Sequence, residues 1–368
     1  MSAVPNQPVP HPQQPHVGST VAEQSLRERF EGHELAIVLS HYELGEIESL
    51  RVYPRGSRRS PKLRIKSRRG EFLLKRRAPG SDDPYRVAFA HDLQLHLAQR
   101  DYPVPGIIGT RDNNSMLQLN GRTYELFNYI HGIRYDRTQG QARQVGIMLG
   151  QLHAHLANFR SRYEPPLASF HGVGEIDAKM AMLPPAVFSA EPQTDRPGVA
   201  ESVEYLRRAY IDAAQRVNAL GFRTWPRCVL HGDWHPGNLL YREDVIVGVL
   251  DFDSARLEPR VVDVANAALQ FSMLMDAPEQ PATWPDGLDV SLIHALLSGY
   301  DEACGSPLTV QERLAIPWLM VEALIIESIV PIAATGSFAR IPGSAFLHMI
   351  QRKVRWIRPR SEALVGCA

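Results

Sequence analysis

The chain has 368 residues, of which 44% are hydrophobic and 22% charged, and its 40 basic side chains balance 40 acidic ones. One hydrophobic core rarely serves so long a chain, so we expect two packed units, and the composition is that of a soluble globular protein. A neutral total charge exerts no general attraction on nucleic acid or anionic membranes, and we expect neither as a partner.

The first residues, 1–20, are rich in Pro, Gln and His and predict a disordered tail without the apolar run of a secretory signal. The most apolar late stretch, 314–334, is interrupted by Glu322, Glu327 and Pro331, which favours a buried helix over a membrane span. The cysteines lack the spacing of a disulfide framework or metal site: Cys228, Cys304 and Cys367. We therefore expect a cytoplasmic protein.

The front of the chain has the pattern of a sheet. After a predicted helix at 21–40, alternating or clustered apolar residues predict strands at 46–53, 62–66 and 71–76, an antiparallel meander. A helix is expected over 84–100, followed by strands at 107–110, 115–119 and 123–129. Asn120-Gly121 is a strong hairpin turn between the last two.

From Gly140 onward the hydrophobic period is that of helices. Apolar residues recur at i, i+3, i+4, i+7 and i+11 in Val145, Met148, Leu149, Leu152 and Leu156. Further helices are predicted at 200–220, 290–303 and 344–358, and another begins at Thr309, which has capping-box spacing to Glu312. The proline-rich interval 164–197 receives no assignment. The expected fold is α+β, with an N-lobe at 21–128 and a helical C-lobe at 129–368.

The most informative segment is 231–238, HGDWHPGN, followed by DFD at 251–253. The carboxylate of Asp233 can align a substrate hydroxyl and accept its proton as the oxygen attacks phosphorus. Asn238 offers a neutral carbonyl oxygen, and Asp251 ends a predicted strand at 245–250. Mg²⁺ favours such a set of few carboxylates completed by phosphate oxygens. The spacing matches the catalytic loop and metal triplet of protein kinases.

A second interpretation of the same segment is a metal site, because His231, Asp233 and His235 alternate. Zinc ligands normally rest on a fixed support such as an H-E-x-x-H helix, whereas glycines and a proline interrupt this loop. We therefore prefer His231 as a residue that braces the loop backbone.

The nucleotide side of such a site is expected upstream. Lys75 ends an apolar run and is placed to grip the α- and β-phosphates. Ser57, in the loop 56–60, can donate to the phosphates together with backbone N–H groups, although no glycine-rich phosphate motif occurs in the chain. Around Glu125 and Phe127 the chain passes from strand to lobe boundary, where its backbone groups can bind adenine.

The segment 51–77 contains twelve Arg or Lys residues, among them the alternative phosphate ligands Lys62 and Lys66, and a single acid, Glu71. Nucleic-acid contact is one interpretation. A solvated strand face beside a polyphosphate site is the other, and the neutral total charge and scarcity of aromatic residues favour it.

Taken together, 231–238 and 251–253 resemble the catalytic loop and metal motif of the aminoglycoside phosphotransferase and choline kinase-like superfamily. Segments 56–61, 72–77, 103–105, 124–132 and 146–153 fall in that superfamily's order, so the resemblance spans about 44–266. It implies a bilobal protein-kinase-like fold with an antiparallel-sheet N-lobe and a mainly helical C-lobe. It also implies ATP- and Mg²⁺-dependent phosphorylation of a small-molecule hydroxyl.

Carried over residue by residue, the resemblance implies that Asp233 is the base and that Asn238 and Asp251 bind the metal, assisted by Asp253. Lys75 is similar to the superfamily's phosphate-binding lysine, and Asp263 resembles its structural acid.

The chain departs from the superfamily at one place. Related proteins pair the lysine with a glutamate on the front-lobe helix, where this sequence has Ala90, His91 and Asp92. Asp92, Glu71 or another acid replaces that glutamate, or Lys75 has no such partner.

A small-molecule kinase is the leading hypothesis. A non-catalytic scaffold or assembly protein with the same fold is an alternative, motivated by the missing helix glutamate. A protein Ser/Thr kinase is another, although no long activation segment separates Asp253 from Asp263. The sequence names neither the acceptor nor the oligomeric state, nor does it distinguish ATP from GTP. A cationic acceptor requires acidic side chains in the C-lobe. Four candidates exist, although a solvated helix face explains them equally well: Glu175, Asp177, Glu201 and Glu204.

Overall fold

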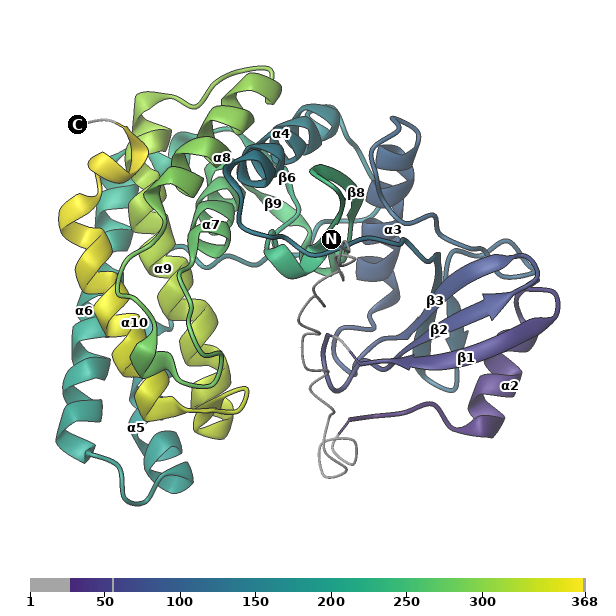
Figure 1. The fold of residues 1–368 in the computed structure, drawn as a ribbon, viewed down its shortest axis with the longest axis horizontal. Helices are drawn as coiled ribbons and strands as arrows, with labels where there is room; N and C mark the ends of the chain where they lie inside the picture. The colour runs from purple at the N-terminus through teal and green to yellow at the C-terminus, as the bar shows by residue number, and fades with distance from the viewer. Residues whose placement is uncertain (1–26, 55, 367–368) are drawn as a thin grey trace, which may run out of the picture.

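The computed structural model describes residues 27–54 and 56–366. A sheet with one small helix on it forms one end of the molecule, and a bundle of helices forms the other (Figure 1). Two short two-stranded antiparallel sheets lie between these parts. The predicted tail at 1–20, the residues 21–26 of the first predicted helix, and Cys367 lie outside the described residues.

The sheet is antiparallel and has the strand order β1-β2-β3-β5-β4. Its strands are β1 (Ile47–Tyr53), β2 (Lys62–Ser67), β3 (Gly70–Arg76), β4 (Leu117–Leu119) and β5 (Arg122–Asn128). The three front strands confirm the expected meander. Asn120 and Gly121 both have positive φ angles, 52° and 71°, as a type I′ hairpin turn requires.

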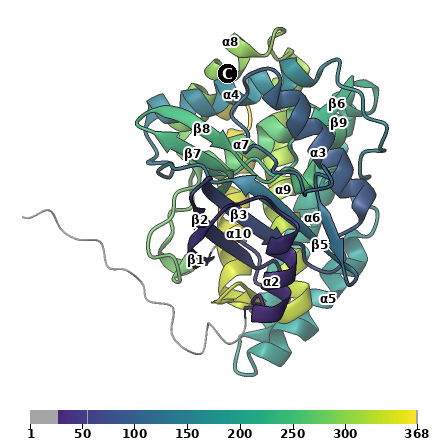
Figure 2. The same ribbon diagram turned by 90° about the vertical axis from the view of Figure 1, so that its right-hand side faces the viewer.

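A small apolar core joins one face of this sheet to helix α2 (Gly32–Ser40), which lies against it in Figure 2. Leu74 and Leu126, at neighbouring positions of β3 and β5, are fully buried there. Because side chains alternate along a strand, the residues on either side of Leu74 point to the opposite face. That opposite face looks toward the helical part of the molecule.

Two predicted elements of the front part are wrong in extent. Within the described part of the helix expected over 21–40, residues 27–31 are not helical and α2 begins at Gly32, because Glu31 and Glu34 close its first turn, with the Glu34 carboxylate accepting the Glu31 N–H at 3.1 Å. The strand expected at 107–110 is a single bridge from Ile107 to Phe127. The segment lies at the margin of the sheet, where only one of its residues pairs with a strand and no continuous row of backbone hydrogen bonds forms.

Helix α3 (Pro84–Ala98) connects the sheet to the rest of the molecule (Figure 1). Its start follows from local chemistry, since Asp83 accepts the N–H groups of Tyr85 and Arg86 and a proline occupies the first helical position. The prediction of 84–100 is confirmed except for the last two residues.

The helical part contains seven further helices among the described residues. These are α4 (Gln139–Leu156), α5 (Ile176–Ala190), α6 (Arg196–Ala219), α7 (Val261–Ser272), α8 (Val290–Ala303), α9 (Val310–Thr335) and α10 (Gly343–Ile357). The short strands β6 (Arg227–Leu230) and β9 (Arg256–Pro259) pair with each other, as do β7 (Leu239–Arg242) and β8 (Val245–Val249). A last two-residue pair consists of β10 (Ser337–Phe338) and β11 (Ile341–Pro342).

Two of these helices have no counterpart in the sequence analysis. Helix α5 contains the adjacent prolines Pro184 and Pro185, which normally break a helix. It persists because Leu183 and Val187 are fully buried in the helical core. Helix α7 is buried on nearly all sides, so it lacks the polar face from which a helix is recognised.

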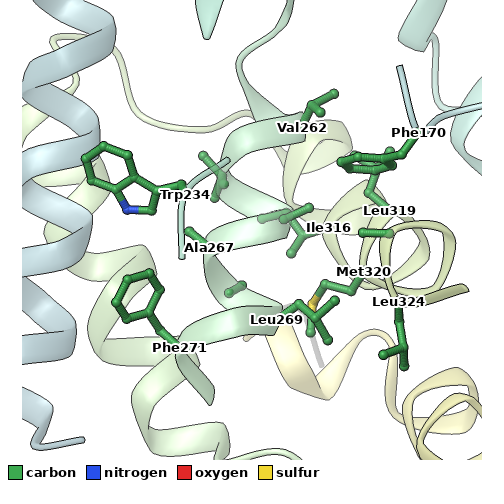
Figure 3. Close-up of a cluster of buried hydrophobic side chains, with 14 of the residues drawn as sticks. Phe170, Trp234, Val262, Ala267, Leu269, Phe271, Ile316, Leu319, Met320 and Leu324 are labelled. Atoms are coloured by element: carbon green, nitrogen blue, oxygen red, sulfur yellow. The ribbon is translucent and has the colours of Figure 1, made fainter. Parts of the chain in front are cut away.

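Helix α9 runs through the centre of the helical core and begins with the predicted capping box of Thr309 and Glu312. By length and composition it could cross a membrane, but 72% of its most apolar window is buried inside the protein. Figure 3 shows side chains of α9, such as Ile316 and Met320, packed against those of α7. Burial of this kind agrees with the expected core helix.

Glycines allow α4 and α8 to touch backbone to backbone. A Cβ at Gly146 would overlap the Leu296 carbonyl oxygen and lie 2.7 Å from the Tyr300 nitrogen. Gly299, on α8, faces the Arg143 carbonyl in the same way. Any side chain here would push the two helices apart.

We therefore expect Gly146→Ala to lower the free energy of unfolding by roughly 1–3 kcal/mol through overpacking. Gly140→Ala, in the first turn of the same helix, is the matched control, because a Cβ there meets open space apart from one atom at 4.0 Å. The control should leave the melting temperature unchanged or raise it slightly. Equal melting temperatures for the two variants would contradict the close helix contact.

Candidate active site

A cavity of about 410 Å³ lies where the open face of the sheet meets the loops after β6 and β8. Seven of the eight predicted site residues line it: Ser57, Lys75, Phe127, Asp233, Asn238, Asp251 and Asp253. The eighth, Glu125, is fully buried next to the cavity instead of lining it. The structure thus brings together residues up to 196 positions apart, from Ser57 to Asp253.

The loop between β6 and β7 is anchored in the helical core. Trp234 is fully buried and lies beside α7 (Figure 3). His231 is fully buried as well, donates from Nε2 to the Leu250 carbonyl at 3.0 Å and accepts the Asp233 N–H at Nδ1 at 3.3 Å. Burial lowers the pKa of His231, which keeps the ring neutral in this tautomer. Both ring nitrogens are used, so His231 braces the loop, as the sequence analysis prefers.

Asp263, at the start of α7, holds the same loop by its backbone. Its carboxylate accepts the N–H groups of His231 at 2.8 Å and Gly232 at 2.9 Å, and it contacts Nε2 of the buried His153 at 3.3 Å. Gly232 has φ +79°, and a Cβ there would overlap the Ser254 carbonyl. The loop conformation therefore depends on a glycine and on one buried carboxylate.

Asp233 and Asn238 are joined directly across this loop. The amide nitrogen of Asn238 donates to the Asp233 backbone oxygen at 2.9 Å and to its carboxylate at 3.1 Å. This orientation leaves the amide oxygen of Asn238 available to a cation. Burial alone would raise the pKa of Asp233, but a hydrogen bond from His235 and its nearby charge outweigh burial and hold the pKa below its usual value. The carboxylate is therefore ionised at neutral pH and can accept a proton.

Asp251 follows β8 in a strained conformation. Its φ of 65° and ψ of 71° lie in the left-handed region, which an aspartate adopts at a cost of order 1 kcal/mol or more. The conformation turns its carboxylate toward the sheet, 3.2 Å from the Lys75 ammonium and 3.7 Å from that of Lys62. Burial opposes ionisation, but these two lysines lower the pKa of Asp251 well below its usual value.

Three charged residues occupy one row across the sheet. The strand register places Lys62 opposite Lys75, and Lys75 opposite Glu125, so all three side chains point to the face that borders the cavity. Arg77 follows Lys75 by two residues and points the same way. Asp253 contacts both of these cations, Lys75 at 2.5 Å and Arg77 at 2.7 Å. Its predicted role as a metal ligand stays a prediction.

Three acids pair with Lys75 in place of the glutamate that is missing from the front-lobe helix. Glu125 lies 3.9 Å from the Lys75 ammonium, besides the closer Asp251 and Asp253. Asp92 instead accepts a hydrogen bond from Ser161, and Glu71 pairs with Arg64. Of the alternatives set out from the sequence, another acid therefore serves as the partner.

The basic strand face is largely paired with acids of the same sheet and of its surroundings. The ion pairs are Arg64–Glu71, Lys66–Glu48, Arg68–Glu46, Arg69–Glu43 and Arg76–Glu34. These contacts account for much of the positive charge in 51–77 without a nucleic-acid partner.

Across residues 27–54 and 56–366, no group of three or more His, Cys, Asp or Glu side chains could hold a metal ion by itself. The alternative of a histidine-based metal site thus receives no support within that part of the chain. An amide oxygen from Asn238 and a carboxylate from Asp251 fit Mg²⁺, which completes its shell with phosphate oxygens and waters.

Two charged residues outside the sequence prediction influence the site without lining the cavity. Glu327, on α9, has an exposed side chain and accepts a hydrogen bond from Gln270 of α7 at 2.9 Å. Partial desolvation by the surrounding helices and the charge of nearby Asp233 raise the pKa of Glu327 to about 7. The sequence shows Glu327 only as an interruption in an apolar helix. The position of Arg77 could have been predicted from the sequence more easily than that of Glu327, because side-chain alternation along β3 and the residue after it places Arg77 on the same face as Lys75.

The model of a known family, described as the phosphotransferase enzyme family, matches residues 49–308 of the chain. Among curated proteins, a homoserine kinase of Xanthobacter autotrophicus is 26% identical over 343 residues, covering 90% of this chain and 88% of the relative. Among solved structures, an amicoumacin kinase in complex with AMP-PNP and Ca²⁺ has a TM-score of 0.66 at 11% identity, covering 91% of this chain and 96% of that one.

A microcompartment-associated aminopropanol kinase has a TM-score of 0.64 at 15% identity, covering 91% of this chain and 98% of that one. At sequence identities this low, the two structures show a shared fold and nothing more. They confirm the bilobal protein-kinase-like architecture expected from the sequence.

Asp263 offers a test of the loop. Asp263→Asn replaces one of the two accepting oxygens by a donor, so a backbone N–H of the loop loses its partner in a buried place. We expect the free energy of unfolding to fall by roughly 1–3 kcal/mol. Asp244→Asn, on the exposed turn between β7 and β8, is the control and should be neutral. Equal stability of both variants in urea denaturation would refute the anchoring role of Asp263.

Proposed function

The chain belongs to the phosphotransferase enzyme family, and from that premise we propose that it transfers the γ-phosphoryl group of ATP to a hydroxyl of a small molecule. The observation that carries this proposal is the convergence of Asp233, Asn238 and Asp251 on one cavity that a lysine also enters. No single one of these residues would suffice, since each has an ordinary structural explanation.

In the proposed reaction, Asp233 accepts the proton of the acceptor hydroxyl while that oxygen bonds to the γ-phosphorus and the bond to ADP breaks. Lys75 holds the phosphate oxygens, and Ser57 and Phe127 line the cavity for the nucleotide. Asn238 and Asp251 would hold Mg²⁺, which when bound supplies positive charge to the phosphate oxygens. Asn238 also fixes Asp233 through its amide nitrogen, so the base and the metal-binding side chain are aligned together.

The geometry favours this activity over the two alternatives. The scaffold hypothesis was motivated by a missing acid near Lys75, and three acids lie within 3.9 Å of its ammonium. A protein kinase would need an activation segment after Asp253, whereas β9 and α7 follow within eight residues.

We further propose that the acceptor carries an amine. Two of the similar proteins are named for homoserine and aminopropanol, small compounds with both a hydroxyl and an amine. Glu327 supports the proposal, because it is an exposed carboxylate close to Asp233, where an ammonium group could pair with it. Of the four acids considered from the sequence, Glu204 and Asp177 are less suitable, since both pair with Arg207 of α6.

We expect Asp233→Asn to lower kcat by about three powers of ten or more, because the hydroxyl loses its proton acceptor while nucleotide binding is kept. The measurement is ADP release with an amino-alcohol panel as acceptors, and KM for ATP should change little. Asp112→Asn, an exposed substitution outside the cavity lining, is the control. Retention of more than about a tenth of kcat in Asp233→Asn would exclude Asp233 as the base.

The pH dependence of acceptor binding tests Glu327. Its carboxylate is mostly protonated below pH 7 and charged above, so kcat/KM for an amine-bearing acceptor should rise as pH increases through about 7. Glu327→Gln should remove this rise and increase KM for the acceptor by about threefold, the loss of one exposed ion pair. A hydroxyl acceptor without an amine is the control and should respond equally to both proteins. The same pH profile in Glu327→Gln would disprove the assignment.

A further inference from the structure

We propose that Glu125 of β5, oriented by His91 of α3, is the positioning residue that keeps Lys75 directed at the nucleotide phosphates. The inference rests on the proposed phosphoryl transfer and goes beyond it. It assigns to a strand carboxylate and a helix histidine the task for which related proteins use a helix glutamate.

Glu125 differs from the other acid partners of Lys75 in its location. Asp251 and Asp253 line the cavity and are about 30% exposed, whereas the Glu125 side chain is 1% exposed and does not line it. A metal ion or phosphate in the cavity would draw Asp251 away from Lys75. Glu125 cannot leave in this way, so it is the partner that persists while nucleotide is bound.

The carboxylate of Glu125 has its orientation fixed by three N–H groups. Oε1 accepts from Nε2 of His91 at 2.8 Å and from Nη2 of Arg77 at 2.9 Å. Oε2 accepts from Nε of Arg77 at 2.7 Å and faces the Lys75 ammonium at 3.9 Å. Burial alone would raise the pKa of Glu125, but Lys75, Arg77 and His91 hold it far below its usual value, so the group is charged. A buried charge held in this way provides a rigid counter-charge for Lys75.

His91 connects this carboxylate to helix α3. Its ring is 2% exposed and its second nitrogen lies 2.8 Å from the Ser115 hydroxyl, so both sides of the ring are occupied. The histidine is one of the three helix residues, 90–92, among which a glutamate is expected from related proteins. Here the helix contributes a donor, and the strand contributes the acid. Helix α3 thus remains connected to Lys75, but through His91 and the carboxylate of Glu125 instead of through a glutamate of its own.

A purely structural role is the competing explanation. In that case Glu125 would serve only to neutralise Arg77, and its loss would lower the melting temperature without a selective change in kinetics toward ATP. The two roles therefore separate in the ratio of KM values for ATP and for the acceptor.

The full wild-type chain is assayed first, and absence of phosphoryl transfer by it would refute the proposed function. In that case the role of Glu125 is tested by titration calorimetry, which measures the affinity of each variant for Mg-ATP. In Glu125→Gln we expect KM for ATP to rise and kcat to fall, each by about tenfold, with KM for the acceptor within about twofold. Wild-type values for ATP in a folded Glu125→Gln protein would overturn the inference.

His91 variants keep the inference falsifiable if Glu125→Gln does not fold. His91→Gln retains an N–H donor and should keep KM for ATP within about twofold, whereas His91→Phe removes the donor and should raise it about fivefold. Asp92→Asn, the next residue on α3, is the matched control, because its carboxylate binds Ser161 outside this network. Equal KM values for ATP in His91→Phe and Asp92→Asn, by kinetics or calorimetry, would overturn the role of His91.

Discussion

The ion-pair network between the sheet and the segment after β8 is the interaction on which the site depends. Lys62, Lys75 and Arg77 come from the sheet, and Asp251 and Asp253 come from the far side of the cavity. With Glu125, three cations face three anions. Buried charges are costly without partners, so each side of the network stabilises the other only when both parts of the molecule are in place. The same contacts that join the sheet to the rest of the molecule also assemble the charged side of the cavity, where we propose that the phosphates bind.

The second constraint is the anchoring of the 231–238 loop in the helical core. Trp234 inserts an aromatic side chain among apolar neighbours, while the Asp263 carboxylate and the His231 ring satisfy the loop backbone and the end of β8. These contacts use residues on both sides of Asp233, so its own carboxylate is free to face the cavity. Rigid support of this kind is what a catalytic carboxylate needs, because activity depends on positions accurate to a fraction of an ångström.

The two constraints meet at Asp251. Its left-handed backbone directs the carboxylate at the lysines, and the Leu250 carbonyl immediately before it accepts the hydrogen bond from His231. One strained residue therefore lies between a braced loop on one side and a charged sheet on the other. Strain of this size persists only where surrounding contacts overdetermine the conformation, which is the situation here.

The sequence by itself determined the strands β1 to β3, the helices with one apolar face such as α4 and α8, and the membership of Asp233, Asn238 and Asp251 in one loop system. These features depend on local spacing, which a single chain displays. Tertiary structure alone decided the rest. Helix α7 has no polar face, α5 contains two prolines, and Glu125 finds Lys75 only through strand pairing and His91 only through helix packing. Contacts between such distant residues are set by how elements pack, and no local pattern records that choice.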